Sequence, residues 1–445
     1  MTGTDVATLA DGNTVIRGTH GPKGNETPSH SRLSGIERVV FYAGAIGLGL
    51  GHSLSAQLVL LVYQLYRLAV DPSARATRAT RSTIALLALG AWMMASGVSA
   101  VSRFDAWGGT VGMALSVWVT LEAVNRVMAD RTELGGRLVR AFLVSSTLGA
   151  LHGLAVFGLY LARRGGLPRA ELPAGGCNTA GTVFAVAMVV ALGCISFARR
   201  WEKIALIVMV AIMGAALGAT QSRGALVALG AGLAVLLVTS LRSRSAKALG
   251  LAIAGLLVVF ASSVHVYPPL SARYASILSP SANSDRFEIW RTAVHMMKDH
   301  PILGVGVNNF HEVYLSYPHP EERSHEVMST AHNIFMEFGA STGIPGLVLF
   351  LSVVAIGIAN GVRACVRSRT GRAPRLAPGG VTGQARGTSG VALAAFAALL
   401  AHLQFDLTIY SGNMLPLFFI VYGVLSHLGE HAPDQPEECG VCARS

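Results

Sequence analysis

Residues 203–240 read KIALIVMVAIMGAALGATQSRGALVALGAGLAVLLVTS, which is two apolar runs joined by a short polar turn. From Ile204 to Ser240 the only charged side chain is that of Arg223, which stands between the two runs. Each run has roughly the 17–25 residues that a helix needs to cross the hydrocarbon core of a bilayer. The stretch therefore predicts a membrane hairpin of two helices with an arginine at its turn.

Runs of this kind recur along the 445 residues of the chain, of which 52% are hydrophobic and 13% charged. A soluble domain has roughly 25% charged residues, so the composition excludes a protein surrounded by water. The segments expected to span the membrane are 37–52, 54–70, 83–101, 107–125, 139–162, 179–198, 203–220, 224–240, 247–266, 334–361, 390–410 and 413–428. We expect an all-α fold, a polytopic transmembrane helical bundle of about 12 spans.

The polar stretches predict the organisation of the rest of the chain. Residues 1–35 lack the apolar stretch of a signal peptide and are expected to form a disordered cytoplasmic tail. The further regions are 36–270 with nine spans, 271–333 as a large outer loop with short amphipathic helices, 334–428 with three spans and a cytoplasmic linker at 363–388, and a cytoplasmic tail at 429–445. That tail contains Cys439 and Cys442 in a spacing that metal sites use, but no second pair completes the four ligands of a structural zinc site.

The formal net charge of +11 is interpreted as a signal of topology and not of nucleic-acid binding, because basic loops of membrane proteins stay in the cytoplasm. With both termini inside, most of the 35 basic residues fall in cytoplasmic segments. The three arginines of residues 163–169 are discordant, because they fall outside. The same topology places Arg223, Arg286 and His332 together on the outer side, where we expect the functional site.

Two arginines stand at predicted helix starts. At Arg223 a phosphate would accept hydrogen bonds from both the helix end and the guanidinium, while the alternative is an arginine that extends to the lipid headgroups. Arg286 lies beside Asp285 in the first turn of an amphipathic helix expected at 285–298, with Trp290 as an interface anchor. For Arg286 the alternative is a solvated charge on a polar face. The apolar stripe of this helix is expected to be Phe287, Trp290, Val294 and Met297.

A histidine precedes the tenth expected span. His332, with Asn333 beside it, lies at a helix start near two arginines, so we expect the neutral imidazole that a general base needs. The alternative is a border histidine that contacts only lipid or water. Glu337 and Asp406 fall inside apolar segments and are expected to hold helices together or orient the site. The other histidines of the loop lack the spacing of metal ligands, so we expect no metal and no cofactor.

Several short motifs follow one another in a specific order. They are Ser222-Arg223-Gly224, Ser284-Asp285-Arg286 with Trp290, His300-Pro301-Ile302-Leu303-Gly304-Val305-Gly306-Val307-Asn308-Asn309-Phe310, Ala331-His332-Asn333-Ile334-Phe335-Met336-Glu337 and Gly343-Ile344-Pro345-Gly346, with Gly176-Cys177-Asn178 and Phe405-Asp406 as weaker features. This set, over about residues 175–430, resembles the O-antigen ligase and polymerase superfamily of bacterial envelope enzymes. The ordered combination is specific, although each motif alone is not.

The resemblance implies a function for the three central residues. Arg223 and Arg286 would hold the diphosphate of an undecaprenyl-diphosphate-linked glycan, and His332 would activate an acceptor hydroxyl. It further implies an inverting, metal-independent transfer in the bacterial inner membrane, with residues 271–333 as a periplasmic catalytic loop. This agrees with the chemistry of the residues, because cationic groups stabilise a departing diphosphate and a neutral base accepts the hydroxyl proton.

The motifs leave the acceptor open. A ligase transfers the glycan to lipid A–core, a polymerase to another lipid-linked repeat, and a third class of the family to a protein hydroxyl. We expect a ligase, because Arg163 and Arg164 in the basic outer loop are placed to meet the phosphates of lipid A–core. The alternative from another class is a transporter of lipid-linked glycans without enzymatic activity, which would carry its charged residues near the membrane midplane.

Overall fold

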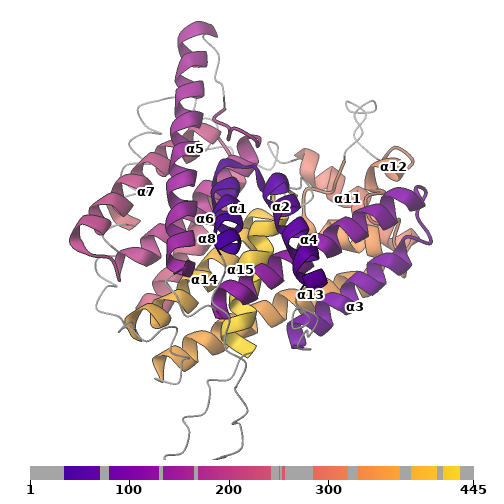
Figure 1. Cartoon of the computed structure of the whole chain (residues 1–445). Helices are drawn as coiled ribbons and strands as arrows, with labels where there is room; N and C mark the ends of the chain where they lie inside the picture. The colour runs from indigo at the N-terminus through magenta and orange to yellow at the C-terminus, as the bar shows by residue number, and fades with distance from the viewer. Residues whose placement is uncertain are drawn as a thin grey trace, which may run out of the picture.

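A computed structural model describes residues 35–70, 80–129, 134–164, 169–241, 250, 253–255, 284–318, 329–370, 382–407 and 414–430. In these residues the chain is helical apart from short connections and one isolated bridge between Leu172 and Gly175. Figure 1 shows the helices as a bundle, with α5 extending beyond the others at one end. Cys439, Cys442 and both predicted tails lie outside the described residues, except for positions 35, 429 and 430.

Eleven of the expected spans coincide with helices. They are α1 (Gly35–Leu50), α2 (Ser53–Val70), α3 (Arg81–Ser96), α4 (Arg103–Ala129), α5 (Leu134–Arg164), α6 (Cys177–Ile195), α7 (Arg200–Thr220), α8 (Arg223–Ser240), α13 (Ile334–Arg369), α14 (Thr382–His402) and α15 (Leu415–Glu430). The expected span 247–266 lies mostly outside the described residues. The predicted linker at 363–388 begins and ends in helix, because α13 continues to Arg369 and α14 starts at Thr382.

Length and composition qualify six of the described helices as candidate spans, namely α4, α5, α6, α7, α8 and α13. Shorter apolar helices are Gln57–Val70 in α2, Gly387–His402 in α14 and the whole of α15. The all-helical, multi-pass architecture is therefore confirmed, while the number of about 12 spans stays a prediction.

Helix ends that were expected on the cytoplasmic side meet one another. Glu37 at the start of α1 lies 2.6 Å from Arg126 near the end of α4. At the start of α3, the Ser82 hydroxyl donates a hydrogen bond of 2.8 Å to Glu430, the last residue of α15. Asn360 in the second half of α13 donates to the same carboxylate at 3.0 Å. The predicted alternating topology places these contacting helix ends on the same side of the membrane.

Helix α6 forms the centre of the main core, with almost every residue from Thr179 to Gly193 buried. Helices α5, α7, α8 and α14 pack around it. Between α8 and α14 the backbones approach closely at Gly232, where an added Cβ would lie 3.0 Å from the Ala398 Cβ. Small residues of this kind are the usual means of packing helices in membranes. The close packing brings the first turn of α8 against the end of α14.

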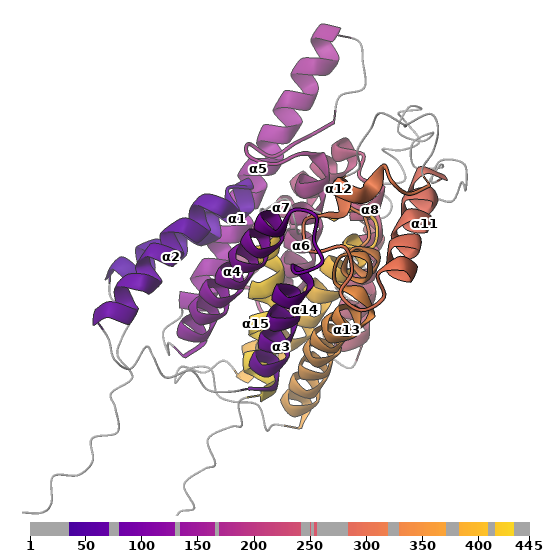
Figure 2. The same ribbon diagram turned by 90° about the vertical axis from the view of Figure 1, so that its right-hand side faces the viewer.

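Helix α11 (Ser284–Asp299) confirms the predicted amphipathic helix and packs on α13. Its buried apolar side chains are Ile289, Ala293 and Met296, and Thr292 is buried beside them, whereas Phe287 is 52% exposed. The buried face is therefore rotated from the predicted stripe, because this helix packs against protein as well as facing outward. Figure 2 shows α11 beside the upper part of α13.

The connection after α11 leads to the short helix α12 (Phe310–Tyr314) and is joined to α13 by backbone hydrogen bonds. The Val305 N–H donates to the Ala340 carbonyl at 2.9 Å, and the Ile344 N–H donates to the Pro301 carbonyl at 2.8 Å. At Gly343 the backbone adopts φ of 70°, which interrupts the regular helix. The His300–Phe310 motif thus fixes α11 on the kinked start of α13.

Candidate active site

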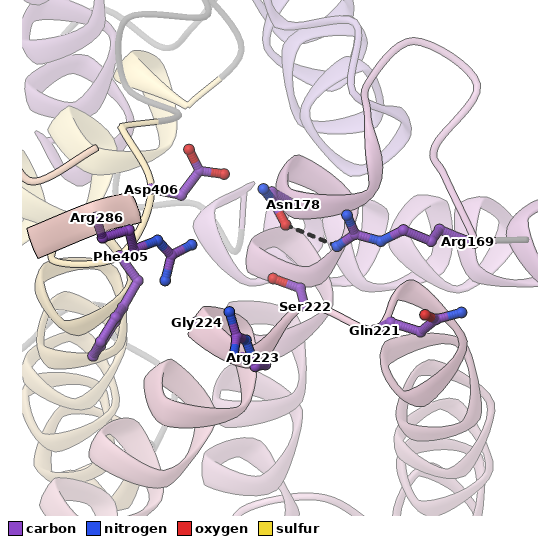
Figure 3. Close-up of a pocket in the computed structure, with 9 residues that line it drawn as sticks. All are labelled: Arg169, Asn178, Gln221, Ser222, Arg223, Gly224, Arg286, Phe405 and Asp406. Carbon is purple, nitrogen blue, oxygen red and sulfur yellow. Dashed lines mark hydrogen bonds between the residues drawn. The ribbon is translucent and has the colours of Figure 1, made fainter. Parts of the chain in front are cut away.

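At the end of the bundle where α8 starts, a pocket collects residues from four distant parts of the chain (Figure 3). Its lining residues are Arg169, Asn178, Gln221, Ser222, Arg223, Gly224, Arg286, Phe405 and Asp406. Three guanidinium groups and one carboxylate face this space, which is a composition suited to an anion. A hard metal ion such as Mg²⁺ or Ca²⁺ prefers several oxygen ligands, so the lining favours a phosphate-like group instead.

Arg223 is the first residue of α8, as the sequence predicted. The turn before it is tight, because Gln221 adopts a left-handed conformation with φ of 53°. Gly224 permits close packing on the segment after α14, since an added Cβ would lie 3.0 Å from the Phe405 Cβ. The Ser-Arg-Gly motif therefore holds the guanidinium at a helix N-terminus, where backbone N–H groups and helix dipole both favour an anion.

Arg286 reaches the same pocket from the first turn of α11. Figure 3 shows its guanidinium directed into the pocket beside Phe405 and Asp406. The two arginines predicted as a pair are thus brought together from segments that are more than sixty residues apart in sequence.

Arg169 is a third arginine of the pocket, and no sequence motif indicated it as a site residue. Its Nε–H donates to the Thr220 carbonyl at 2.8 Å, and Nη2 donates to Asn178 Oδ1 at 3.1 Å. The Ala170 N–H also donates to the Ala219 carbonyl at 2.9 Å, which fixes the chain here against the end of α7. Of the three arginines of the basic outer loop at residues 163–169, Arg169 therefore lines the pocket.

His332 borders this pocket through Asp406. The His332 Nδ1 lies 3.2 Å from Asp406 Oδ1, and the exposed fractions of the two side chains are 35% and 15%. His332 adopts a left-handed backbone conformation with φ of 50°, which is uncommon for a residue other than glycine. Asp406 follows the end of α14 at His402 and does not lie within the helix, in contrast to the expected span 390–410.

The carboxyl of Asp406 is held in its ionised form. Burial acts to raise the pKa of Asp406, but the hydrogen bond from His332, the nearby His402 and a hydrogen bond from Asn178 outweigh it, so that the pKa is lowered. An ionised carboxylate accepts the proton of Nδ1 and leaves Nε2 of the same imidazole as the basic nitrogen. This is the arrangement that a general base requires.

Asn333 and Glu337 fix the loop that carries His332. The Asn333 side chain caps α13 by accepting from the backbone N–H groups of Phe335 and Met336. Glu337 is 1% exposed, and its carboxylate accepts from the Ala331 N–H at 2.7 Å. Both side chains therefore act on the loop and on α13, and neither lines the pocket.

The remaining predicted residues lie elsewhere or outside the described side chains. Trp290 packs edge-on against Phe287, with ring centroids 5.5 Å apart. Arg163 is exposed near the end of α5. The side chains of Arg164 and Asp285 lie outside the described part of the structure.

The fold and the pocket define a class of protein, namely a multi-pass helical membrane protein with an arginine-lined pocket at one end of its helices. Comparison with known proteins adds the family. Residues 208–351, which include Arg223, Arg286 and His332, match the family model described as O-antigen ligase. This match supports the resemblance to the same family that the motifs of the chain indicate.

A curated relative agrees with this assignment. An O-antigen ligase of Pseudomonas aeruginosa is 30% identical over 150 residues, which are 34% of this chain and 33% of the relative. The matched part of the chain thus spans about a third of the length of that relative.

Proposed function

We propose that this protein is a membrane glycosyltransferase that moves a glycan from undecaprenyl diphosphate to a hydroxyl group of lipid A–core at the periplasmic face of the inner membrane. The observation that carries the proposal is the juxtaposition of Arg223 and Arg286 in one pocket with Asp406, which is hydrogen-bonded to His332. Such a site combines binding of a diphosphate with removal of a proton. The match to this family supports the same class of reaction.

In this reaction the acceptor oxygen attacks the anomeric carbon from the side opposite the diphosphate, and the new C–O bond forms as the bond to the phosphate oxygen breaks. The electron pair leaves with undecaprenyl diphosphate, whose developing charge Arg223 and Arg286 stabilise. The hydroxyl proton passes to Nε2 of His332, and Asp406 stabilises the imidazolium that results. The configuration of the anomeric carbon is inverted, and no metal is needed for any of these steps.

The geometry supports an enzyme over a transporter. The charged residues of the pocket gather at one end of the helices, at the starts of α8 and α11 and beyond the end of α14. A transporter would place them at breaks within helices near the membrane midplane. The preference for lipid A–core as acceptor rests on Arg163, which is exposed next to the last residue of α5.

Transfer by the purified protein tests this proposal. The assay contains an undecaprenyl-diphosphate-linked glycan with either lipid A–core or a second lipid-linked glycan as acceptor. Formation of glycosylated lipid A–core is the expected result, and chain growth on the second acceptor would instead identify a polymerase. Passage of the donor across vesicles without transfer to either acceptor would contradict the proposal and support the transporter.

A further inference from the structure

Asn178 lies between the anion-binding side of the pocket and its predicted base. It is the second residue of α6 and half-buried, and Figure 3 shows its amide between Arg169 and Asp406. On one side, Oδ1 accepts a hydrogen bond of 3.1 Å from Arg169 Nη2. On the other side, the amide nitrogen points toward the carboxylate of Asp406, which lines the same pocket (Figure 3).

The chemistry of the two neighbours fixes the orientation of this amide. A guanidinium can only donate and a carboxylate can only accept, so Oδ1 must face Arg169 and Nδ2 must face Asp406. Aspartate at position 178 would still bind Arg169, but it would repel Asp406. Leucine has nearly the same shape and would bind neither. Asparagine is thus the residue type of this size that satisfies both neighbours.

We propose that Asn178 is a positioning residue that joins the diphosphate-binding arginines to the base, by fixing Arg169 on one side and Asp406 on the other. Hydrogen bonds join the Thr220 carbonyl to Arg169 and Arg169 to Asn178, and Asn178 faces Asp406, which is hydrogen-bonded to His332. This chain of residues joins the end of α7, the start of α6, the turn after α14 and the loop before α13. Arg169 is then a third cation for the donor diphosphate, held in a fixed plane by its two bonds.

This inference rests on the proposed function, since it assumes that Asp406 orients His332 for proton removal. Asn178 acts through Asp406, so its removal should lower the rate of transfer more than the binding of donor. A misplacement of a reacting group by about 1 Å can cost roughly 10²-fold in rate. We therefore expect Asn178→Leu to lower kcat by about 10²-fold, with undecaprenyl diphosphate still bound by Arg223 and Arg286.

The test compares Asn178→Leu, Asp406→Asn and the double variant in the full-length protein. If Asn178 acts through Asp406, the double variant should be no slower than Asp406→Asn alone, because coupled residues are not additive. Asn125→Leu on α4, where the asparagine is exposed, is the matched control and should keep normal transfer. Independent, additive losses in the double variant would overturn the proposal, as would normal kcat in Asn178→Leu.

A second variant gives a readout that general destabilisation does not change. Asn178→Asp places a second carboxylate beside Asp406, which also faces Arg286, His332 and His402. Like charges raise the pKa of a carboxyl, so activity that needs ionised Asp406 should be lost at a higher pH than in the unchanged protein. If the Asn178→Asp variant loses transfer activity at the same acidic pH as the unchanged protein, the proposal is contradicted. Loss of transfer in His332→Ala together with normal Asn178 variants would remove this inference and leave the proposed function intact.

Discussion

The imidazole of His332 and the carboxylate of Asp406 lie 3.2 Å apart although 74 residues separate them in sequence. One precedes α13 and the other follows α14, so the contact depends on how the two helices pack. The Ile334 N–H donates to the Leu403 carbonyl at 2.9 Å, which joins the same two segments through the backbone. The pair is therefore built into the fold and does not depend on two flexible side chains.

Asp406→Asn should reduce transfer strongly while donor binding persists. The amide cannot stabilise an imidazolium on His332, and it can favour the wrong tautomer of the neutral ring. We expect a loss of about 10²-fold in kcat, at the lower end of what general-base catalysis contributes. Steady-state transfer rates and binding of undecaprenyl diphosphate, measured on the same preparation, separate the two effects. A variant that fails to bind the lipid would show that Asp406 shapes the pocket instead.

Glu337→Leu should impair the site from a distance, because it leaves the buried Ala331 N–H without its acceptor. An unsatisfied buried donor costs about 1–3 kcal/mol, and here the cost falls on the loop that carries His332. Glu337→Gln retains an acceptor oxygen, so it should lower thermal stability and transfer rate less than Glu337→Leu does. Equal losses of stability and transfer in the two variants would show that the hydrogen bond to Ala331 does not hold the loop that carries His332.

Transfer should continue in the presence of a chelator. The pocket presents three arginines and one carboxylate, and arginines provide the charge that a divalent cation would otherwise supply to the leaving diphosphate. Rates measured with and without EDTA should agree. A loss that Mg²⁺ or Mn²⁺ restores would contradict this expectation.

The topology predicts that residues 271–333 lie outside the cytoplasmic membrane and that both termini lie inside. The reason is the distribution of basic residues, since positively charged segments are retained in the cytoplasm. Reporter fusions within the loop and at the C-terminus provide the measurement. Cytoplasmic location of the loop would exclude a periplasmic site and the mechanism that depends on it.

The sequence predicts the helices of this fold well because long apolar runs have few alternative structures in a membrane. It also indicates Arg223, Arg286 and His332, since each is a polar residue at the border of an apolar run. From the sequence, Arg169 belongs only to a basic outer loop. Its place in the pocket depends on the packing of the neighbouring backbone against the end of α7, which the sequence does not reveal. Asn178 carries only a weak motif signal, because its hydrogen bond to Arg169 and its place beside Asp406 exist only in the assembled bundle.

The buried face of α11 also differs from the apolar stripe that the sequence predicts. Periodicity in the sequence finds the most apolar stripe, whereas the structure buries Ile289, Ala293 and Met296 against α12 and α13. Larger side chains such as Phe287 remain partly exposed, which suits a helix at the surface of the bilayer.

The central claim is that His332 is the base and that Arg223 and Arg286 hold the diphosphate. The most direct measurement compares transfer and undecaprenyl diphosphate binding in His332→Ala, Arg223→Lys and Arg286→Lys, with His311→Ala on α12 as the control. We expect His332→Ala to lose about 10²–10⁴-fold in transfer while it still binds the lipid.

Each lysine variant should bind the lipid about tenfold more weakly or worse, because lysine cannot make the planar two-pronged contact and a charge-assisted hydrogen bond contributes about 1.5–3 kcal/mol. His311→Ala should remain active. Normal transfer by a folded His332→Ala variant would contradict the role of His332 as the base. Normal lipid binding by both lysine variants would show that Arg223 and Arg286 do not bind the diphosphate.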